Sequence, residues 1–340
     1  MSLPPSEIPL GAMRFNSDSQ KLEYWNGGAW FQIKTFSPNL DGGVRGLFFG
    51  GDPSRDTNMD YITIPTRGNS IDFGDYPISN GTGSRGIVAS NTRGFGAGGE
   101  SPVGDSHNYI IKFEFSSTGS AIDFANLTFT SKGGAGCSNA TRGIFTRGYG
   151  APSIAREEID FFTMATQQNA VDFGDLQSGA SYLGCGMASP TRGIIVCGRD
   201  TGGQANIIEY ITIATTGDAT DFGDATNQEN AVAGCVGGNS TRGVFAGGGD
   251  SSTTDVAYIT YTTLGNTIQF GDLYTGNGYA APASDRITLV TGGGNAPSNP
   301  TNRMDAVAIS TGGTSVDFGD TVSPSKYGGA GFSNGHGGLG

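Results

Sequence analysis

The chain alternates short apolar runs with short polar turns, and the alternation repeats about every 50 residues. One unit shows the pattern clearly: a run of small residues at 183–189, an apolar run at 194–198, an aromatic and β-branched run at 207–214, and a short run at 219–222. Runs of this length and composition, bounded by Gly, Pro, Thr and Asn, predict β-strands. We refer to the four expected strands of each unit as a, b, c and d.

Two sequence markers carry the same repeat. Asp-Phe-Gly-Asp closes strand d at 72–75, 172–175, 221–224 and 317–320, with altered copies at 123–126 and 269–272, so that the copies lie 48 to 51 residues apart. Thr-Arg-Gly precedes strand b at 92–94, 141–143, 191–193 and 241–243, with Val-Arg-Gly at 44–46 and Asp-Arg-Ile at 285–287. Six units of four strands are typical of β-propeller blades and not of a helical solenoid.

The frame of the repeats predicts how the ring closes. Strand a consists mostly of Gly, Ala, Ser and Cys, as expected where the first strands of all blades converge on a central axis. The first unit begins at strand b (46–51), and the run 328–333 supplies an extra strand a near the end of the chain. Pairing these two strands leaves no open edge. We therefore expect an all-β, six-bladed β-propeller over residues 37–340, with four strands per blade and closed by the C-terminal strand.

The two markers supply the candidate structural residues of the repeat. We expect the phenylalanine of each strand d to wedge between neighbouring blades, with the following Gly-Asp making the turn; these residues are Phe73, Phe124, Phe173, Phe222, Phe270 and Phe318. The recurring arginines are Arg45, Arg93, Arg142, Arg192, Arg242 and Arg286. Each is expected to pair with a carboxylate such as the Asp of strand d, or to cap turn carbonyls. The alternative is a ring of arginines that binds an anionic ligand.

Composition and charge narrow the function classes. Glycine contributes 59 residues, but 20 Phe and 12 Tyr argue against a disordered chain. The net charge is −12, and no run of basic residues is present, so we expect no nucleic-acid partner. No apolar stretch approaches the roughly 20 residues of a membrane span, so we expect no membrane insertion. Residues 1–5 lack the features of a secretory signal. The four cysteines show no zinc-type spacing and are expected to be small buried apolar residues.

No motif for catalysis or cofactor binding stands out, and we expect no enzyme, no cofactor and no metal site. Asp-Phe-Gly is also a kinase motif, but here it recurs periodically without the other kinase motifs. Asp72, Asp75 and their equivalents lack the clustered oxygens of a calcium loop. The two histidines, His107 and His336, suggest no triad, and His336 between glycines is expected to be solvated. Carboxylate pairs for glycoside cleavage in the loops stay open.

Residues 1–36 do not belong to the repeat. Turn signals at 16–19 and 26–28 separate three short alternating strands that contain Phe15, Tyr24, Trp25, Trp30 and Phe31. So small a piece cannot bury these aromatic side chains by itself. We expect a β module that docks on the propeller, on copies of itself or on another protein.

Three resemblances follow from these segments. The a–turn–b stretch 184–198 resembles the core of kelch repeats, although the late tryptophan of each kelch repeat is missing. Residues 11–33, with Gly-Ala-Met-Arg-Phe-Asn and Leu-Glu-Tyr-Trp-Asn-Gly-Gly-Ala-Trp, resemble a small module at the N-termini of tailed-phage fibre and appendage proteins. The propeller repeats also resemble those of marine and cyanobacterial phage virion proteins. This resemblance implies a virion protein, assembled in the host cytoplasm, that attaches to other virion proteins and forms a homo-oligomer through its N-terminal module.

Strand order also predicts a recognition face. The a–b turns are nearly uniform, whereas the b–c loops (52–58, 100–107, 149–158, 200–206, 249–255 and 294–303) differ in every unit. Because functional loops vary on a repeated scaffold, we expect the b–c and d–a loops to contact a host polysaccharide or protein. The candidates are Arg55, His107, Arg156, Tyr182, Tyr274, Tyr279, Arg303 and Tyr327. The alternatives are a decoration or cement protein without a receptor, and a cellular lectin-like interaction module.

Overall fold

The computed structural model describes residues 8–16, 21–32, 44–49, 57–76, 86–99, 106–150, 154–177, 182–196, 198–200, 203–227, 235–249, 252–296, 299–322 and 330–339. The chain divides into two compact units, Met1–Gly43 and Val44–Gly340. Within the described residues, neither unit contains a helix with the length and apolar character needed to cross a membrane.

The N-terminal unit is one antiparallel sheet in the order β1 (Met13–Asn16), β2 (Lys21–Trp25) and β3 (Trp30–Gln32). The turn between β2 and β3 is held by Asn26, whose Oδ1 accepts hydrogen bonds from the Gly28 and Ala29 amides at 2.9 Å. Asn is favoured at turns because its side chain replaces a main-chain acceptor in this way. The three strands expected from the sequence are therefore present.

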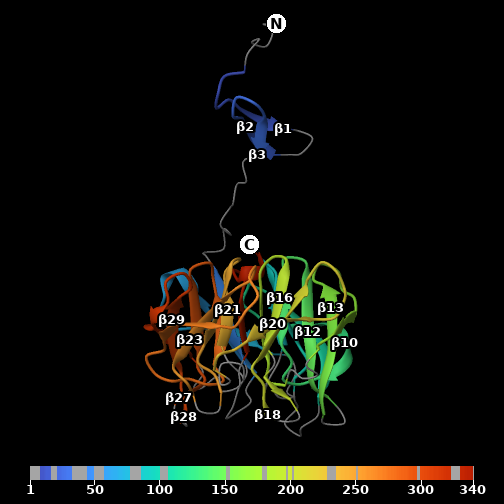
Figure 1. The fold of residues 1–340 in the computed structure, drawn as a ribbon, viewed down its shortest axis with the longest axis vertical. Helices are drawn as coiled ribbons and strands as arrows, with labels where there is room; N and C mark the ends of the chain where they lie inside the picture. Colours follow the sequence, from blue (N-terminus) through green and yellow to red (C-terminus); the bar gives the residue numbers. More distant parts are fainter. Residues whose placement is uncertain are drawn as a thin grey trace. The chain divides into compact units, whose positions relative to one another are not determined.

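The second unit is a ring of six blades, each a sheet whose four main strands are antiparallel (Figure 1). Blade 1 contains β32 (Ala330–Ser333), β4 (Arg45–Phe49), β5 (Asn58–Thr63) and β6 (Ile71–Asp75), and blade 2 contains β7 (Gly86–Ala89), β8 (Arg93–Ala97), β9 (His107–Glu114) and β10 (Ile122–Ser131). Blade 3 contains β11 (Gly136–Ser138), β12 (Arg142–Gly150), β13 (Ile154–Thr163) and β14 (Val171–Asp175), and blade 4 contains β15 (Cys185–Ala188), β16 (Arg192–Val196), β19 (Ile207–Thr212) and β20 (Thr220–Asp224).

Blades 5 and 6 add short extra strands to the same plan. Blade 5 contains β21 (Cys235–Gly238), β22 (Arg242–Ala246), β23 (Asp255–Thr260) and β24 (Ile268–Asp272), and blade 6 contains β25 (Ala281–Ser284), β26 (Thr288–Gly292), β29 (Arg303–Ala308) and β31 (Val316–Asp320). The short β30 (Gly313–Thr314) joins the edge of blade 5 parallel to β24. Two small hairpins lie between strands b and c. In blade 4 the hairpin pairs β17 (Arg199–Asp200) with β18 (Gly203–Gln204), and in blade 6 it pairs β27 (Asn295–Ala296) with β28 (Asn299–Pro300). Two single-turn 3₁₀ helices, η1 (Ile64–Thr66) and η2 (Gly337–Leu339), complete the described elements.

The ring closes as the repeat frame predicted. Strand β32 near the end of the chain pairs antiparallel with β4, so that Ala330 lies opposite Phe49 and Ser333 opposite Gly46. This pairing confirms the six-bladed propeller closed by the C-terminal strand. Every blade then has its full set of four main strands.

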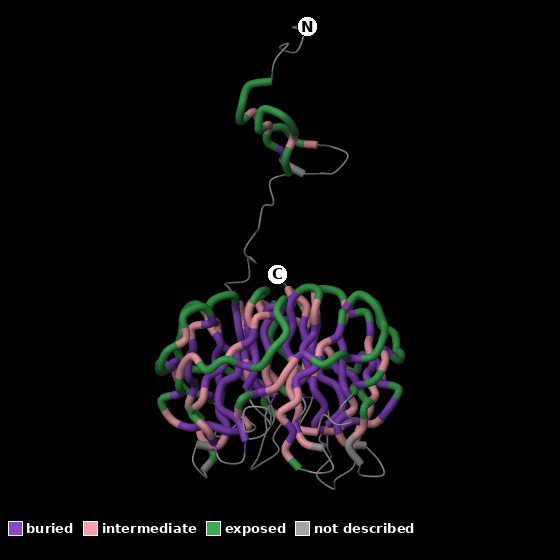
Figure 2. Tube along the Cα trace, viewed as in Figure 1, coloured by how far each residue is buried: buried purple, intermediate pink, exposed green. Residues whose placement is uncertain are grey.

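The cores lie between blades and not within a single sheet. Six clusters of buried side chains each join two neighbouring blades, and each contains one phenylalanine of the Asp-Phe-Gly-Asp positions. Phe73 of blade 1, for example, makes an edge contact with Phe113 of blade 2 at a centroid distance of 6.1 Å. Figure 2 shows the buried strands as the interior of the ring, with exposed turns at one of its faces.

The Gly-Asp of the motif does not make a turn, contrary to our expectation. Both residues belong to strand d, next to a register shift against strand c such as that between Ile159 and Asp160. From there strand d hydrogen-bonds to the next blade. In blade 3, the carbonyl oxygens of Phe173 and Asp175 accept from the amides of Gly217 and Ala219, each at 2.8 Å. The same pair of bonds joins blades 1 and 2, 4 and 5, and 6 and 1. We call this contact the interblade latch.

Candidate functional site between blades 5 and 6

The two faces of the ring differ in their regularity. The a–b turns lie at the face where the C-terminus ends, and the b–c hairpin strands β18, β27 and β28 lie at the opposite end (Figure 1). We call these the a–b face and the b–c face.

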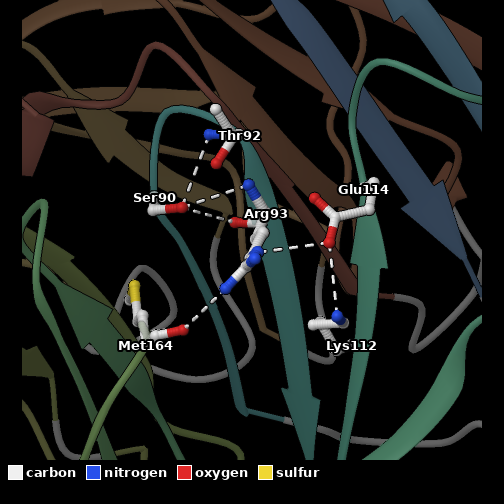
Figure 3. Close-up of polar contacts among 6 residues, drawn as sticks. All are labelled: Ser90, Thr92, Arg93, Lys112, Glu114 and Met164. Atoms are coloured by element: carbon white, nitrogen blue, oxygen red, sulfur yellow. Dashed lines mark hydrogen bonds and ion pairs between the residues drawn. The ribbon is translucent and has the colours of Figure 1, made fainter. Parts of the chain in front are cut away.

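The recurring arginines belong to the a–b face and bond to protein atoms. In blade 2, Ser90 Oγ accepts from the Arg93 amide at 3.1 Å, Arg93 Nε lies 3.1 Å from Glu114 Oε1, and Arg93 Nη1 donates to the carbonyl of Met164 in blade 3 (Figure 3). Lys112 Nζ lies 3.3 Å from the same glutamate oxygen. Arg93 therefore fastens its turn to the next blade.

Four other arginines repeat the contact with the next blade. Each Nη1 donates to the carbonyl of the residue that follows strand c there: Arg45 to Phe115, Arg142 to Ile213, Arg192 to Tyr261, and Arg242 to Ile309. Their guanidinium groups also stack on an aromatic ring of strand c, at 4.3 Å in Arg192 over Tyr210. In the sixth unit, the carbonyl of Arg286 accepts from Asn239 Nδ2 at 3.2 Å. The partners of these five guanidinium groups are thus mainly carbonyl groups of the next blade, together with one carboxylate, that of Glu114 in strand c.

The axis contains a small cavity of about 60 Å³, lined by the a strands of all six blades and by His336. His336 is not solvated, which corrects our expectation. Its Nε2 lies 2.9 Å from the carbonyl oxygen of Ala89, and its Nδ1 accepts from the Gly338 amide at 3.2 Å. The ring therefore carries its proton on Nε2, and burial lowers the pKa of His336.

This histidine also lies 3.4 Å from Ser138 Oγ, a distance that resembles a nucleophile and its base. The arrangement does not activate the serine. Nε2 donates its proton to Ala89, so it has no lone pair to accept the Ser138 proton, and Ser138 itself bonds to the main chain of Ala89. A general base needs a free acceptor within reach of the nucleophile. His336 instead fastens the end of the chain to the axis.

Within the described part of the chain, no three His, Cys, Asp or Glu side chains are grouped so that they could hold a metal ion. Cys137 and Cys235 are buried and free, as predicted, and burial raises the pKa of Cys137 to about 12. Cys185 is half-buried, and Cys197 lies outside the described residues.

The predicted recognition residues fall into separate places. Arg55 and Tyr327 lie outside the described residues. His107 stacks on Tyr109 at 5.4 Å, and Tyr182 contacts the ring of Tyr149 at 4.4 Å. Arg156 lies in β13 opposite Gly148, and Tyr279 precedes β25 with a positive φ of 58°. Tyr274 and Arg303 are brought together in one pocket.

This pocket has a volume of about 570 Å³ and is lined by Tyr274, Arg303, Ser315, Val316, Asp317 and Asp320. Tyr274 follows strand d of blade 5, Arg303 begins strand c of blade 6, and Asp320 ends strand d of blade 6. The guanidinium carbon of Arg303 lies 4.9 Å from the centre of the Tyr274 ring. A volume of 300–1,000 Å³ with a few convergent polar groups is typical of small-molecule sites. We call it the Tyr274 pocket.

A buried carboxylate holds the pocket in shape. Arg303 donates from Nε and Nη2 to Asp305 Oδ1, at 3.0 and 2.7 Å, and the Asp305 side chain is only 3% exposed. Burial raises the pKa of Asp305, although the bonds from Arg303 oppose this change. The Tyr274 amide donates to Ser315 Oγ at 2.9 Å. Asp305 thus fixes the guanidinium group of Arg303, and Ser315 fixes the main chain at Tyr274.

Sequence reasoning did not select Asp305, Ser315, Asp317 or Asp320 as site residues. A signal for Asp305 was present, because strand c carries a buried acid between apolar neighbours in four blades, at Asp60, Asp160, Glu209 and Asp305. Asp160 shows what such an acid does, since it accepts from the amide of Thr128 in the preceding blade at 2.7 Å. An acid inside an apolar strand indicates a buried polar contact.

The five predicted attachment residues occupy both faces of the N-terminal sheet. Arg14, Glu23, Trp25 and Trp30 share one face, where Arg14 Nη2 lies 2.9 Å from Glu23 Oε2 and the Arg14 guanidinium stacks on Trp30 at 4.2 Å. Glu23 also accepts from Asn16, and these contacts lower the pKa of its carboxyl. The other face carries Met13, Phe15, Leu22, Tyr24 and Phe31. We call this the apolar face.

Comparison with known proteins gives the class of fold. The sequence matches no protein-family model and no curated protein. Among solved structures, the one titled "Structure of YjhT" has a TM-score of 0.64 at 11% identity, over 80% of this chain and 94% of that chain. At so low an identity the likeness shows the fold alone. The protein is a β-propeller, and since 323 solved chains share the likeness, the fold by itself defines no activity.

Proposed function

We propose that this protein is a non-enzymatic structural component of a tailed-phage virion, such as a tail fibre, appendage or other tail-associated protein. The N-terminal module attaches it to the particle, and the propeller recognises a protein or glycan of the host surface. The protein is assembled in the host cytoplasm and acts in the virion. The apolar face of the N-terminal sheet carries the attachment part of this proposal.

That face leaves large side chains in contact with water. Met13 is 65% exposed, Phe15 66%, Phe31 48% and Tyr24 39%. The opposite face instead carries the ion pair of Arg14 with Glu23 and the stacking of Arg14 on Trp30. A clustered apolar surface of this kind marks an interaction site. Covering it stabilises the complex by roughly 1 kcal/mol or more for each large side chain.

The two faces of the ring support the recognition part. At the a–b face the arginine contacts repeat from blade to blade, which is the behaviour of a scaffold. At the b–c face the residues differ, and one junction forms the Tyr274 pocket. Variation confined to one side of a repeated scaffold supports recognition there.

A double substitution on the apolar face tests the attachment. In the full-length chain, Phe15→Ser with Phe31→Ser should abolish self-association, measured by light scattering, and reduce incorporation into purified particles. The matched control is Ile71→Ser with Val171→Ser, which alters two exposed apolar residues of the propeller (57% and 52%) and should leave both unchanged. Equal incorporation of the two variants would contradict the proposed attachment. Incorporation without binding to host cells would favour a decoration protein instead.

A further inference from the structure

The Tyr274 pocket departs from the repeat at two positions. Two residues after each Asp-Phe-Gly-Asp position, the main-chain amide bonds to a side chain of the next blade; the described residues at this position are Thr128, Gln177, Thr226, Tyr274 and Val322. The residue of strand c that lies opposite the last residue of each Asp-Phe-Gly-Asp position is Asn58, Tyr109, Glu158, Ile207, Asp255 or Arg303. Among the described junctions, only blades 5 and 6 combine an aromatic ring with a cation.

The aromatic ring is both exposed and held in place. Tyr274 is 71% exposed, its amide is bonded to Ser315, and the Arg303 guanidinium lies against its ring. Arg303 in turn is fixed by the buried Asp305. A platform that is ordered before binding loses little conformational entropy when a ligand arrives. The open part of the ring is therefore suited to receive a flat apolar surface.

The charges of the pocket select the ligand. Asp305 accepts two bonds from Arg303 and offsets its charge, while Asp317 and Asp320 add two carboxylates to the lining. The surplus of negative charge, on a protein with a net charge of −12, repels anions. Carboxylate oxygens accept hydrogen bonds and the guanidinium group donates them, so adjacent hydroxyl groups fit both.

The geometry points to a neutral hexopyranose as the ligand of the Tyr274 pocket. The C–H face of the sugar ring packs on Tyr274, and its hydroxyl groups bond to Asp317, Asp320 and the outer edge of Arg303. This inference rests on the proposed function, because it names the ligand class that the b–c face recognises. It places the sugar at the junction of two blades and not on the axis, where the cavity is small.

Saturation-transfer NMR on the full-length protein tests the inference. The probes are glucose, galactose, mannose and N-acetylglucosamine, as free sugars and as short oligosaccharides, with glucuronic acid and glucosamine as charged counterparts. We expect transfer to at least one neutral sugar and none to glucuronic acid. Tyr274→Ala should weaken binding by about tenfold or more, whereas Tyr274→Phe keeps the ring and should retain it. Val322→Ala is the matched control at the same position of the repeat, and it should bind as the unchanged protein does.

The carboxylates are tested separately. Asp317→Asn combined with Asp320→Asn removes two negative charges. This double variant should therefore bind the neutral sugar more weakly and should begin to bind glucuronic acid. Three results would each overturn the inference: no transfer to any of the neutral sugars, equal binding by Tyr274→Ala and Val322→Ala, or a preference for glucuronic acid over the neutral sugars. Binding of the fluorescently labelled protein to host cells distinguishes failure of this inference from failure of the proposed function. Cell binding that survives Tyr274→Ala would leave recognition intact but place it outside this pocket.

Discussion

The interblade latch makes a quantitative prediction for a pair of glycines. Gly174 in strand d has φ of +146°, and an added Cβ would lie 2.5 Å from the carbonyl carbon of Gly217. Gly217 has φ of +152°, but a Cβ there would meet nothing within 4 Å. Alanine at either position pays the strain of this backbone conformation, about 1–3 kcal/mol. Only Gly174→Ala must also force the two blades apart.

The additional cost can be set from the contacts that would be displaced. Overpacking in a closely packed region costs about 1–3 kcal/mol. Separating the chains would also weaken the Gly217 amide to Phe173 bond and the Asp175 amide to Asp218 Oδ1 bond, at 2.8 and 3.1 Å. The gain from a less flexible unfolded chain is the same for both variants. We therefore expect Gly174→Ala to lower the free energy of unfolding by about 1–3 kcal/mol more than Gly217→Ala.

Urea unfolding followed by far-ultraviolet circular dichroism measures this difference. Tryptophan fluorescence is unsuitable, because Trp25 and Trp30 both lie in the N-terminal module. Similar slopes for the two variants are required for the comparison. The same ordering should hold for Gly74 against Gly119, Gly223 against Gly265, and Gly319 against Gly68. Equal losses within these pairs would refute the close approach of strand d to the next blade.

Two further predictions concern the a–b face and the axis. Arg142→Met removes the hydrogen bonds from Nη1 to the carbonyls of Ile213 and Ala214 and the stacking on Phe161. Thermal unfolding should therefore show that the free energy of unfolding falls by about 1–3 kcal/mol. Loss of anion binding at an unchanged melting temperature would instead identify the arginines as a ligand site. Burial lowers the pKa of His336 in the folded protein, so the unfolded chain takes up the proton at a higher pH than the folded protein does. The stability that His336 contributes is therefore complete above its ordinary pKa near 6.5 and falls as the pH drops below that value. His336→Asn should flatten this pH dependence relative to the unchanged protein, and parallel profiles of the two would contradict the buried neutral ring.

The sequence predicted the propeller because its two markers recur once per blade. Each marker lies in a local segment, and the missing first strand near residue 46 showed where the chain must close on itself. The latch could not be read in the same way. The amide of Asp175 bonds to Asp218, and these residues belong to different units whose separation in space is set by the ring. Glycine followed by aspartate also suggests a turn, so the motif itself favoured the wrong local structure.

The candidate site was predicted in part for the same reason. Tyr274 and Arg303 were selected because they lie in variable loops, but their contact depends on how strand d of blade 5 meets strand c of blade 6. Asp305 lies inside an apolar strand, and the sequence does not show that it accepts two hydrogen bonds from the Arg303 side chain. His336 was misjudged because its glycine neighbours suggested solvent. These glycines instead allow the chain to approach the axis, where a Cβ at Gly337 would lie 2.3 Å from the carbonyl oxygen of Asn239.

The central claim is that the N-terminal module attaches a recognition propeller to a virion. Its most direct test compares the full chain with a variant lacking residues 1–36, measured as the amount of each in purified phage particles. We predict that the shortened protein folds with the circular dichroism spectrum of the propeller, still binds host cells, and is absent from the particles. Incorporation of the shortened protein at the level of the full chain would contradict the claim.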